Sequence, residues 1–117
     1  MTRLLLAGAG GFLGSVARYG ISLLMAPLTG TFPWATLAIN VAGCFLIGLA
    51  MPWVEGRPEW LVFVVPGVLG GFTTFSAFGH ETHRLAQGNS PLLAAVYVVA
   101  SVGFGLAAVW VGRGLAK

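Results

Sequence analysis

The chain has 117 residues, of which 57% are hydrophobic and only 8% are charged, and its formal net charge is +3. A soluble domain usually carries about 25% charged residues, so this composition excludes a water-soluble fold. The basic residues are scattered along the chain, which argues against nucleic-acid binding. Together these properties predict an integral membrane protein that forms a single domain over residues 1–117.

Four segments are apolar and long enough to cross a bilayer, which takes about 20 residues of helix. They cover approximately residues 4–25, 34–54, 60–87 and 91–111, and the third contains a predicted helix break at residues 70–74. Proline and glycine in the short connections are typical of helix ends. The sequence therefore predicts an all-α integral membrane fold with four transmembrane helices.

An even number of spans places both termini on the same side of the membrane. The basic residues favour that side only weakly, so they do not fix one orientation. Four short helices do not easily enclose a pore, and their embedded polar side chains need a partner to cover them. We therefore expect an oligomer, most simply a homodimer.

In the first span, Gly10 and Gly14 form a G-x-x-x-G pair, which favours close contact with another helix. The neighbouring glycines are similar to a dinucleotide-binding turn, but Leu13 stands where the last glycine belongs and no strand precedes it. Arg18 is the only charged residue of this span after Arg3. Its guanidinium either extends to the membrane surface or takes part in ion handling.

Polar side chains recur at helical spacing in the second and fourth spans. Thr36 and Asn40 are four residues apart, and Tyr97 and Ser101 repeat this spacing, so each pair shares a helix face. Isolated hydroxyls in spans often serve only helix packing, whereas a buried amide is costly unless it is hydrogen-bonded. Asn40 is therefore the stronger candidate for a functional residue.

The third span contains the run GGFTTFSAF at residues 70–78. Adjacent glycines and β-branched threonines disfavour a continuous helix, so we expect a break in the middle of the membrane. Such a break frees backbone carbonyl groups, which are tolerated there only where they are buried or line a cavity, and ion sites are often built at broken helices. Phe75 and Phe78 would share one face of the helix after the break, with Ser76 beside them.

The polar groups of the spans indicate an anion as the transported species. No Asp or Glu lies in the middle of a span, although cation and proton pathways usually use embedded carboxylates. Hydroxyls, an amide and a guanidinium all donate hydrogen bonds, and a phenyl ring presents a positive edge. Glu81 lies near a helix end, where we expect it to pair with Arg84, and His80 and His83 lack the spacing of a zinc motif. No nucleophile and base are arranged for catalysis, so we do not expect an enzyme.

Three blocks of the sequence resemble motifs of the small fluoride channels known as the Fluc or CrcB family. The block GGFLGSVARY at residues 10–19 resembles G-G-x-x-G-A-x-x-R-Y, and WATLAINVAG at residues 34–43 resembles G-T-L-x-V-N-x-x-G. The most specific block, GGFTTFSAF at residues 70–78, resembles G-G-x-T-T-F-S-T-F. Among the positions where the chain departs from what is usual in the family are Ala35, Ile39, Ala77 and, where a fourth-span hydroxyl is common, Gly105.

The resemblance implies an antiparallel, dual-topology homodimer with two narrow fluoride pores, located in the cytoplasmic (inner) membrane of a bacterium. It also implies a structural Na⁺ at the dimer centre, which is not transported and is held by the backbone carbonyls of Gly70 and Thr73 from both subunits. Phe75 and Phe78 would line each pore, and Asn40 would orient a ring edge and contact fluoride. Further polar positions, along the pore or at its vestibule, would be Thr36, Ser76, Tyr97, Ser101 and Arg18.

Under this resemblance the chain would let toxic fluoride leave the cytoplasm passively. Its partners would be a second copy of the chain, fluoride and the lipid bilayer. A small-multidrug-type cation/proton antiporter is an alternative of similar size, but it needs a glutamate within its first span, which this chain lacks. A second alternative, a non-conducting subunit of a larger membrane complex, would leave the Asn40 and phenylalanine stripes without a purpose.

Overall fold

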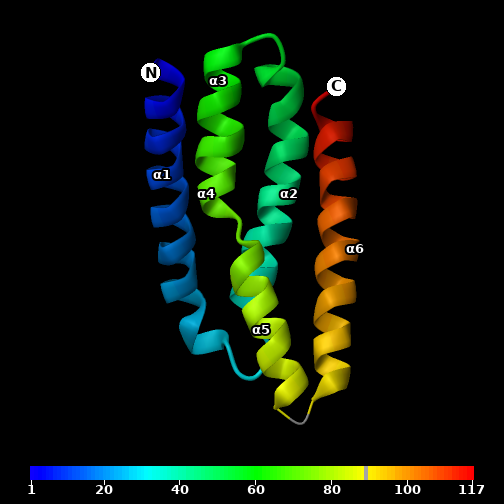
Figure 1. The fold of residues 1–117 in the computed structure, drawn as a ribbon. Helices are drawn as coiled ribbons and strands as arrows, with labels where there is room; N and C mark the ends of the chain where they lie inside the picture. Colours follow the sequence, from blue (N-terminus) through cyan, green and yellow to red (C-terminus); the bar gives the residue numbers. More distant parts are fainter. Residues whose placement is uncertain (89) are drawn as a thin grey trace.

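A computed structural model describes residues 1–88 and 90–117. These residues form helices and contain no strand, and both termini lie at the same end of the bundle (Figure 1). A 3₁₀ turn (Ala26–Leu28) follows the first helix, and a π-helical segment, η2 (Phe63–Leu69), joins α3 to α4. The α-helices are α1 (Thr2–Met25), α2 (Trp34–Val54), α3 (Pro58–Val62), α4 (Gly70–Phe72), α5 (Phe75–Gln87) and α6 (Pro91–Leu115).

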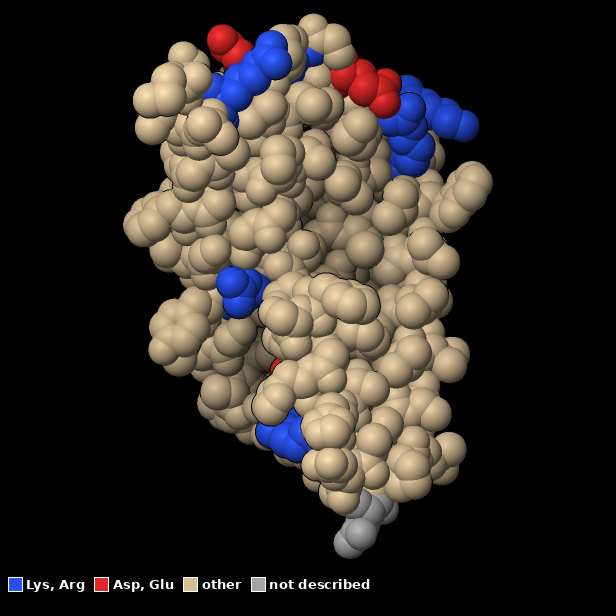
Figure 2. Space-filling view, in the orientation of Figure 1, with Lys and Arg blue, Asp and Glu red and all other residues tan. Residues whose placement is uncertain are grey.

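The prediction of an all-α fold with four spanning helices is confirmed by length and composition. α1 and α6 extend a few residues beyond the expected apolar stretches, to Thr2 and Leu115. In the space-filling view, charged side chains gather at the end that carries both termini, and the side of the bundle is mostly uncharged (Figure 2). Among the described residues, the columns long and apolar enough to cross a membrane are Thr2–Leu28, Trp34–Val54, Pro58–Gln87 and Pro91–Leu115.

Glycines bring α1 against the third column at backbone distance. Gly10 and Gly14 are buried, and a Cβ at Gly14 would lie 2.7 Å from the backbone nitrogen of Phe72. From the other side, a Cβ at Gly67 would lie 3.1 Å from the Cα of Gly10. Because only a residue without a Cβ allows such an approach, the predicted close-contact role of Gly10 and Gly14 is confirmed.

A second glycine seam joins α2 to α6. Gly48 and Gly112 are buried, and each faces the backbone of the other helix. A Cβ at Gly48 would lie 2.9 Å from the nitrogen of Arg113, and one at Gly112 would lie 3.0 Å from the nitrogen of Leu49. This seam sets the separation between α2 and α6, and therefore between the polar side chains that the two helices carry.

The third column is interrupted between α4 and α5 (Figure 1). Thr73 has φ −82° and ψ 160°, and Thr74 has φ −150° and ψ 116°, so both residues are extended. The Thr74 hydroxyl oxygen accepts a hydrogen bond of 3.2 Å from the Ala77 N–H, which is the usual way to cap the start of a helix. The two threonines therefore both separate α4 from α5 and start α5.

The extended backbone covers fewer residues than the expected break at residues 70–74, because it is limited to Thr73 and Thr74. The glycine pair that opens the motif lies inside α4. Gly71 packs directly against the backbone of Gly11 in α1, with a hypothetical Cβ only 3.0 Å from the Gly11 Cα. The absence of a side chain at Gly71 thus allows close contact between α4 and α1, and the break in the helix lies at Thr73 and Thr74.

Candidate functional site

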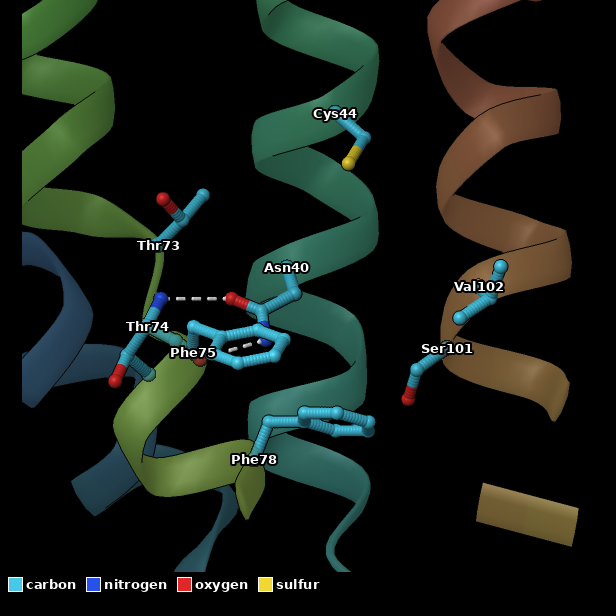
Figure 3. Close-up of a pocket in the computed structure, with 8 residues that line it drawn as sticks. All are labelled: Asn40, Cys44, Thr73, Thr74, Phe75, Phe78, Ser101 and Val102. Carbon is cyan, nitrogen blue, oxygen red and sulfur yellow. Dashed lines mark hydrogen bonds between the residues drawn. The ribbon is translucent and has the colours of Figure 1, made fainter. Parts of the chain in front are cut away.

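The extended residue Thr74 is held by the side-chain amide of Asn40, which lies on α2. Asn40 Nδ2 donates a hydrogen bond of 3.0 Å to the Thr74 carbonyl oxygen, and the Thr74 N–H donates one of 2.8 Å to Asn40 Oδ1 (Figure 3). The amide thereby satisfies both backbone groups that the break exposes at this residue. An amide nitrogen carries two hydrogens, so this pairing leaves one Nδ2 hydrogen of Asn40 unused.

A pocket of about 280 Å³ lies beside this amide (Figure 3). The rings of Phe75 and Phe78 are 5.5 Å apart and tilted by 42°. Across the pocket, the Ser101 hydroxyl of α6 is buried and has no hydrogen-bond partner among the described residues. No carboxylate is part of the described lining, which consists of Asn40, Cys44, Thr73, Thr74, Phe75, Phe78, Ser101 and Val102.

Some site residues selected from the sequence meet in this pocket, and others do not. Ser76 is exposed, and its hydroxyl lies 3.3 Å from that of Thr74. Thr36 and Tyr97 also lie outside the lining. The structure brings together five of the selected residues, from three separate stretches of the chain: Asn40, Thr73, Phe75, Phe78 and Ser101.

Thr36 and Tyr97 meet at Glu81 of α5. Thr36 Oγ1 donates a hydrogen bond of 2.8 Å to Glu81 Oε1, and the Tyr97 hydroxyl donates one of 2.7 Å to Glu81 Oε2. Tyr97 is fully buried. Its ring centroid lies 5.2 Å from that of Phe78, so one phenyl ring separates the pocket from this hydroxyl–carboxylate cluster of Thr36, Glu81 and Tyr97.

The expected pairing of Glu81 with Arg84 is wrong. In the part of the chain that the structure describes, the ion pair joins Arg113 to Glu55 at 3.5 Å. Arg84 is exposed, whereas Glu81 lies on the inner face of α5 and accepts the two hydroxyl hydrogen bonds. The Glu81 carboxylate therefore lies beside the hydroxyls of Thr36 and Tyr97, outside the described lining of the pocket.

The carbonyl oxygens at the end of α4 fall into two groups. The Gly71 oxygen accepts hydrogen bonds from Arg18 Nε at 3.0 Å and from Ser15 Oγ at 3.4 Å, so the guanidinium turns toward the neighbouring column. Within residues 1–88 and 90–117, no hydrogen bond is donated to the Gly70 or Thr73 oxygen. Oxygen atoms such as these are the ligands that hard cations prefer, so they fit the Na⁺ that the resemblance implies.

The described residues contain no group of three or more His, Cys, Asp or Glu side chains that could hold a metal ion.

Comparison with known proteins places the chain in a family. Residues 5–113 match the sequence model of the family described as CrcB-like protein, Camphor Resistance (CrcB). The chain belongs to the CrcB family. The resemblance carried by its three motif blocks is thus confirmed, and with four helices able to span a bilayer this CrcB chain is a multi-pass membrane protein.

Relatives in the CrcB family are similar to the chain over nearly its whole length, and the three described next are each named fluoride-specific ion channel FluC. The one from Rhizobium meliloti (strain 1021) is 44% identical and covers 100% of this chain and 98% of its own length. The one from Chlorobaculum tepidum is 46% identical, with 100% and 96% covered. The one from Paramagnetospirillum magneticum is 46% identical, with 92% and 90% covered.

Glu81 and Cys44 are among the residues at the site of this CrcB chain that were not selected from the sequence. Glu81 follows Phe78 by three residues, which continues the face of α5 that carries the phenylalanines. Cys44 follows Asn40 by four residues on α2, which places its thiol in the same pocket. A Cβ at Gly105 would lie 3.4 Å from Cys44 Sγ. The Cys44 thiol therefore lies next to Gly105 of α6.

Proposed function

We propose that the chain is a fluoride-selective channel that lets fluoride leave the cytoplasm passively. The observation that carries this proposal is the pocket at the break, where the unused Asn40 hydrogen, the Ser101 hydroxyl and the rings of Phe75 and Phe78 surround about 280 Å³. Amide and hydroxyl hydrogens and phenyl edges all offer positive charge to an anion. The name that the relatives share supports fluoride as that anion.

Fluoride is small and strongly hydrated, so a selective path must replace its water molecules with donors at short range. The pocket would supply one set of donors, and the Thr36 and Tyr97 hydroxyls beyond Phe78 would supply the next. In the structure both hydroxyls donate to Glu81. At these hydroxyls fluoride would compete with the Glu81 carboxylate for each hydrogen and would also be repelled by its charge. This cluster would therefore hold fluoride more weakly than the pocket does, which favours release.

The proposal includes a structural Na⁺ that is not transported. The carbonyl oxygens of Gly70 and Thr73 from two subunits would hold it, and their lack of hydrogen-bond donors within the described residues supports this assignment. When bound, the ion would supply a fixed positive charge that offsets part of the cost of bringing an anion into a region of low dielectric constant.

The functional unit that we propose is an antiparallel, dual-topology homodimer in the bacterial inner membrane. Phe75 is 84% exposed in a single chain, so one copy leaves the pocket without a wall on that side. A second copy would supply this wall. Both termini lie at one end of the bundle (Figure 1), and the weak bias of basic residues permits insertion in either orientation.

Fluoride efflux from liposomes that contain the purified protein tests the proposal, with chloride-loaded liposomes as the matched control. We expect rapid loss of fluoride and negligible loss of chloride, without an imposed proton gradient. An antiporter would instead move organic cations in exchange for protons, and a non-conducting subunit would move neither anion. Either of these results would refute the channel.

A further inference from the structure

Arg18 on α1 reaches across to the end of α4. Its Nε donates a hydrogen bond of 3.0 Å to the Gly71 carbonyl oxygen, and Ser15, about one turn earlier, donates one of 3.4 Å to the same atom. Carbonyl groups at the end of a helix have no partner within the helix, and the helix dipole is negative there. A guanidinium at this position therefore donates a hydrogen bond to the free carbonyl oxygen, and its positive charge lies next to the negative end of the helix dipole.

Some carbonyl oxygens of this last turn accept hydrogen bonds, and others accept none from the described residues. The Leu69 oxygen accepts hydrogen bonds from the Thr73 N–H at 3.0 Å and from the Thr73 hydroxyl at 2.9 Å. The Gly71 oxygen is taken by α1. The Gly70, Phe72 and Thr73 oxygens accept no hydrogen bond from the described residues, and the resemblance assigns the Gly70 and Thr73 oxygens to the cation.

We infer that Arg18 is a positioning residue for the sodium site, an inference that rests on the proposed sodium-containing channel. By holding the Gly71 carbonyl, the guanidinium removes this oxygen from the possible cation ligands. It also fixes the segment of backbone that joins the two ligand carbonyls, those of Gly70 and Thr73. A planar guanidinium with several N–H groups in a rigid arrangement suits this task better than a flexible ammonium.

The experiment measures how sodium stabilises the protein, separately from conduction. Purified protein is unfolded by heat in detergent over a series of sodium concentrations, with N-methylglucamine replacing sodium at constant ionic strength. Because a ligand that binds only the folded state stabilises it in proportion to ln(1 + [L]/Kd), the series gives the sodium concentration at which stabilisation begins. The variants are Arg18→Gln, Arg18→Lys and a matched control, Arg3→Gln, at an exposed arginine of the same helix.

We expect this sodium concentration to rise about tenfold in Arg18→Gln. It should rise less in Arg18→Lys, which keeps the charge but loses the planar group, and should not change in Arg3→Gln. If Arg18→Gln has a lower melting temperature but the same sodium dependence as the wild type, Arg18 has only a structural role and the inference is overturned. If Arg18→Gln does not fold, the sodium dependence of Arg18→Lys is compared with that of the wild type instead. An unchanged sodium dependence in Arg18→Lys then overturns the inference.

Failure of the channel and failure of this inference give different results. A wild-type protein that conducts fluoride but is not stabilised by sodium overturns the role of Arg18 and leaves the channel standing. A wild-type protein that conducts no fluoride refutes the channel, whereas the sodium dependence of the variants still decides whether Arg18 positions a cation site.

Discussion

The contact between α2 and α6 can be tested by two alanine substitutions that lie two residues apart. Gly112→Ala adds a Cβ against the backbone of α2, near the Phe45 carbonyl oxygen and 3.0 Å from the Leu49 nitrogen. Gly114→Ala adds a Cβ where no atom lies within 4 Å. Two residues of helix turn by about 200°, so the second substitution makes the same chemical change on the opposite side of α6.

The expected magnitude follows from what the new methyl group meets. Carbon atoms normally pack at about 3.5–4.0 Å, so Gly112→Ala has to push α6 away from α2. The obstructing atoms belong to the backbone, and no side-chain rotation relieves the overlap. Such overpacking costs about 1–3 kcal/mol, whereas both variants gain the same helix propensity, up to about 1 kcal/mol. We therefore expect Gly112→Ala to be about 1–3 kcal/mol less stable than Gly114→Ala.

Equilibrium unfolding in mixed detergent micelles, followed by tryptophan fluorescence, measures this difference. Fluoride efflux should also fall in Gly112→Ala and stay near the wild-type rate in Gly114→Ala, because the seam sets the distance between Asn40 and Ser101 across the pocket. Equal free energies of unfolding for the two variants would refute the packing argument.

Three further experiments address the pocket and the hydroxyl–carboxylate cluster. Asn40→Asp places a carboxylate about 4 Å from fluoride. At an effective dielectric constant of about 20 this charge repels fluoride by about 4 kcal/mol, so efflux should fall by about three orders of magnitude. Efflux at the wild-type rate would exclude Asn40 from the pathway. Phe78→Ile removes the positive ring edge but keeps apolar bulk, so efflux should fall sharply while the protein stays folded by melting temperature, and unchanged efflux would exclude the ring. Tyr97→Phe removes the 2.7 Å hydrogen bond that Tyr97 donates to Glu81, and Glu81→Leu removes its acceptor. The effects of the two substitutions on the free energy of unfolding should therefore depart from additivity by about 0.5–3 kcal/mol. Additive effects would show that the two groups are not coupled.

The four spans, and the neighbourhood of Phe75 and Phe78, could be predicted because both depend on local patterns. Span length follows from apolar composition and bilayer thickness, and residues three apart share a face on any helix. The amide of Asn40 could be selected because a buried amide needs a partner. Its partner, the backbone of Thr74, became evident only when α2 and the break were placed side by side.

The spacing from Phe78 places Glu81 on one face of α5, but the hydroxyl partners of Glu81 and the packing of Gly71 depend on contacts between helices, which local patterns do not give. Glu81 looked like a helix-end residue because its position was judged along a single 28-residue span, residues 60–87, whereas α5 is a separate helix whose inner face is set by Phe78. Gly71 looked like a helix breaker because its propensity is poor. Its contact with Gly11 in α1 keeps it helical, which shows tertiary packing overriding a weak local preference.

Side chains of both neighbouring helices, α1 and α2, bind the backbone at the interruption of the third column. Asn40 of α2 pairs with the N–H and carbonyl groups of Thr74, and Arg18 of α1 holds the carbonyl of Gly71. Extended backbone at membrane depth is tolerated only when its polar groups find partners, so these two contacts explain how the column can be interrupted there. They do not reach the two carbonyl oxygens proposed to bind Na⁺, which point to no donor within the described residues. A bound cation would satisfy both of these acceptors without a hydrogen-bond donor, which is the physical reason to expect one at this interruption.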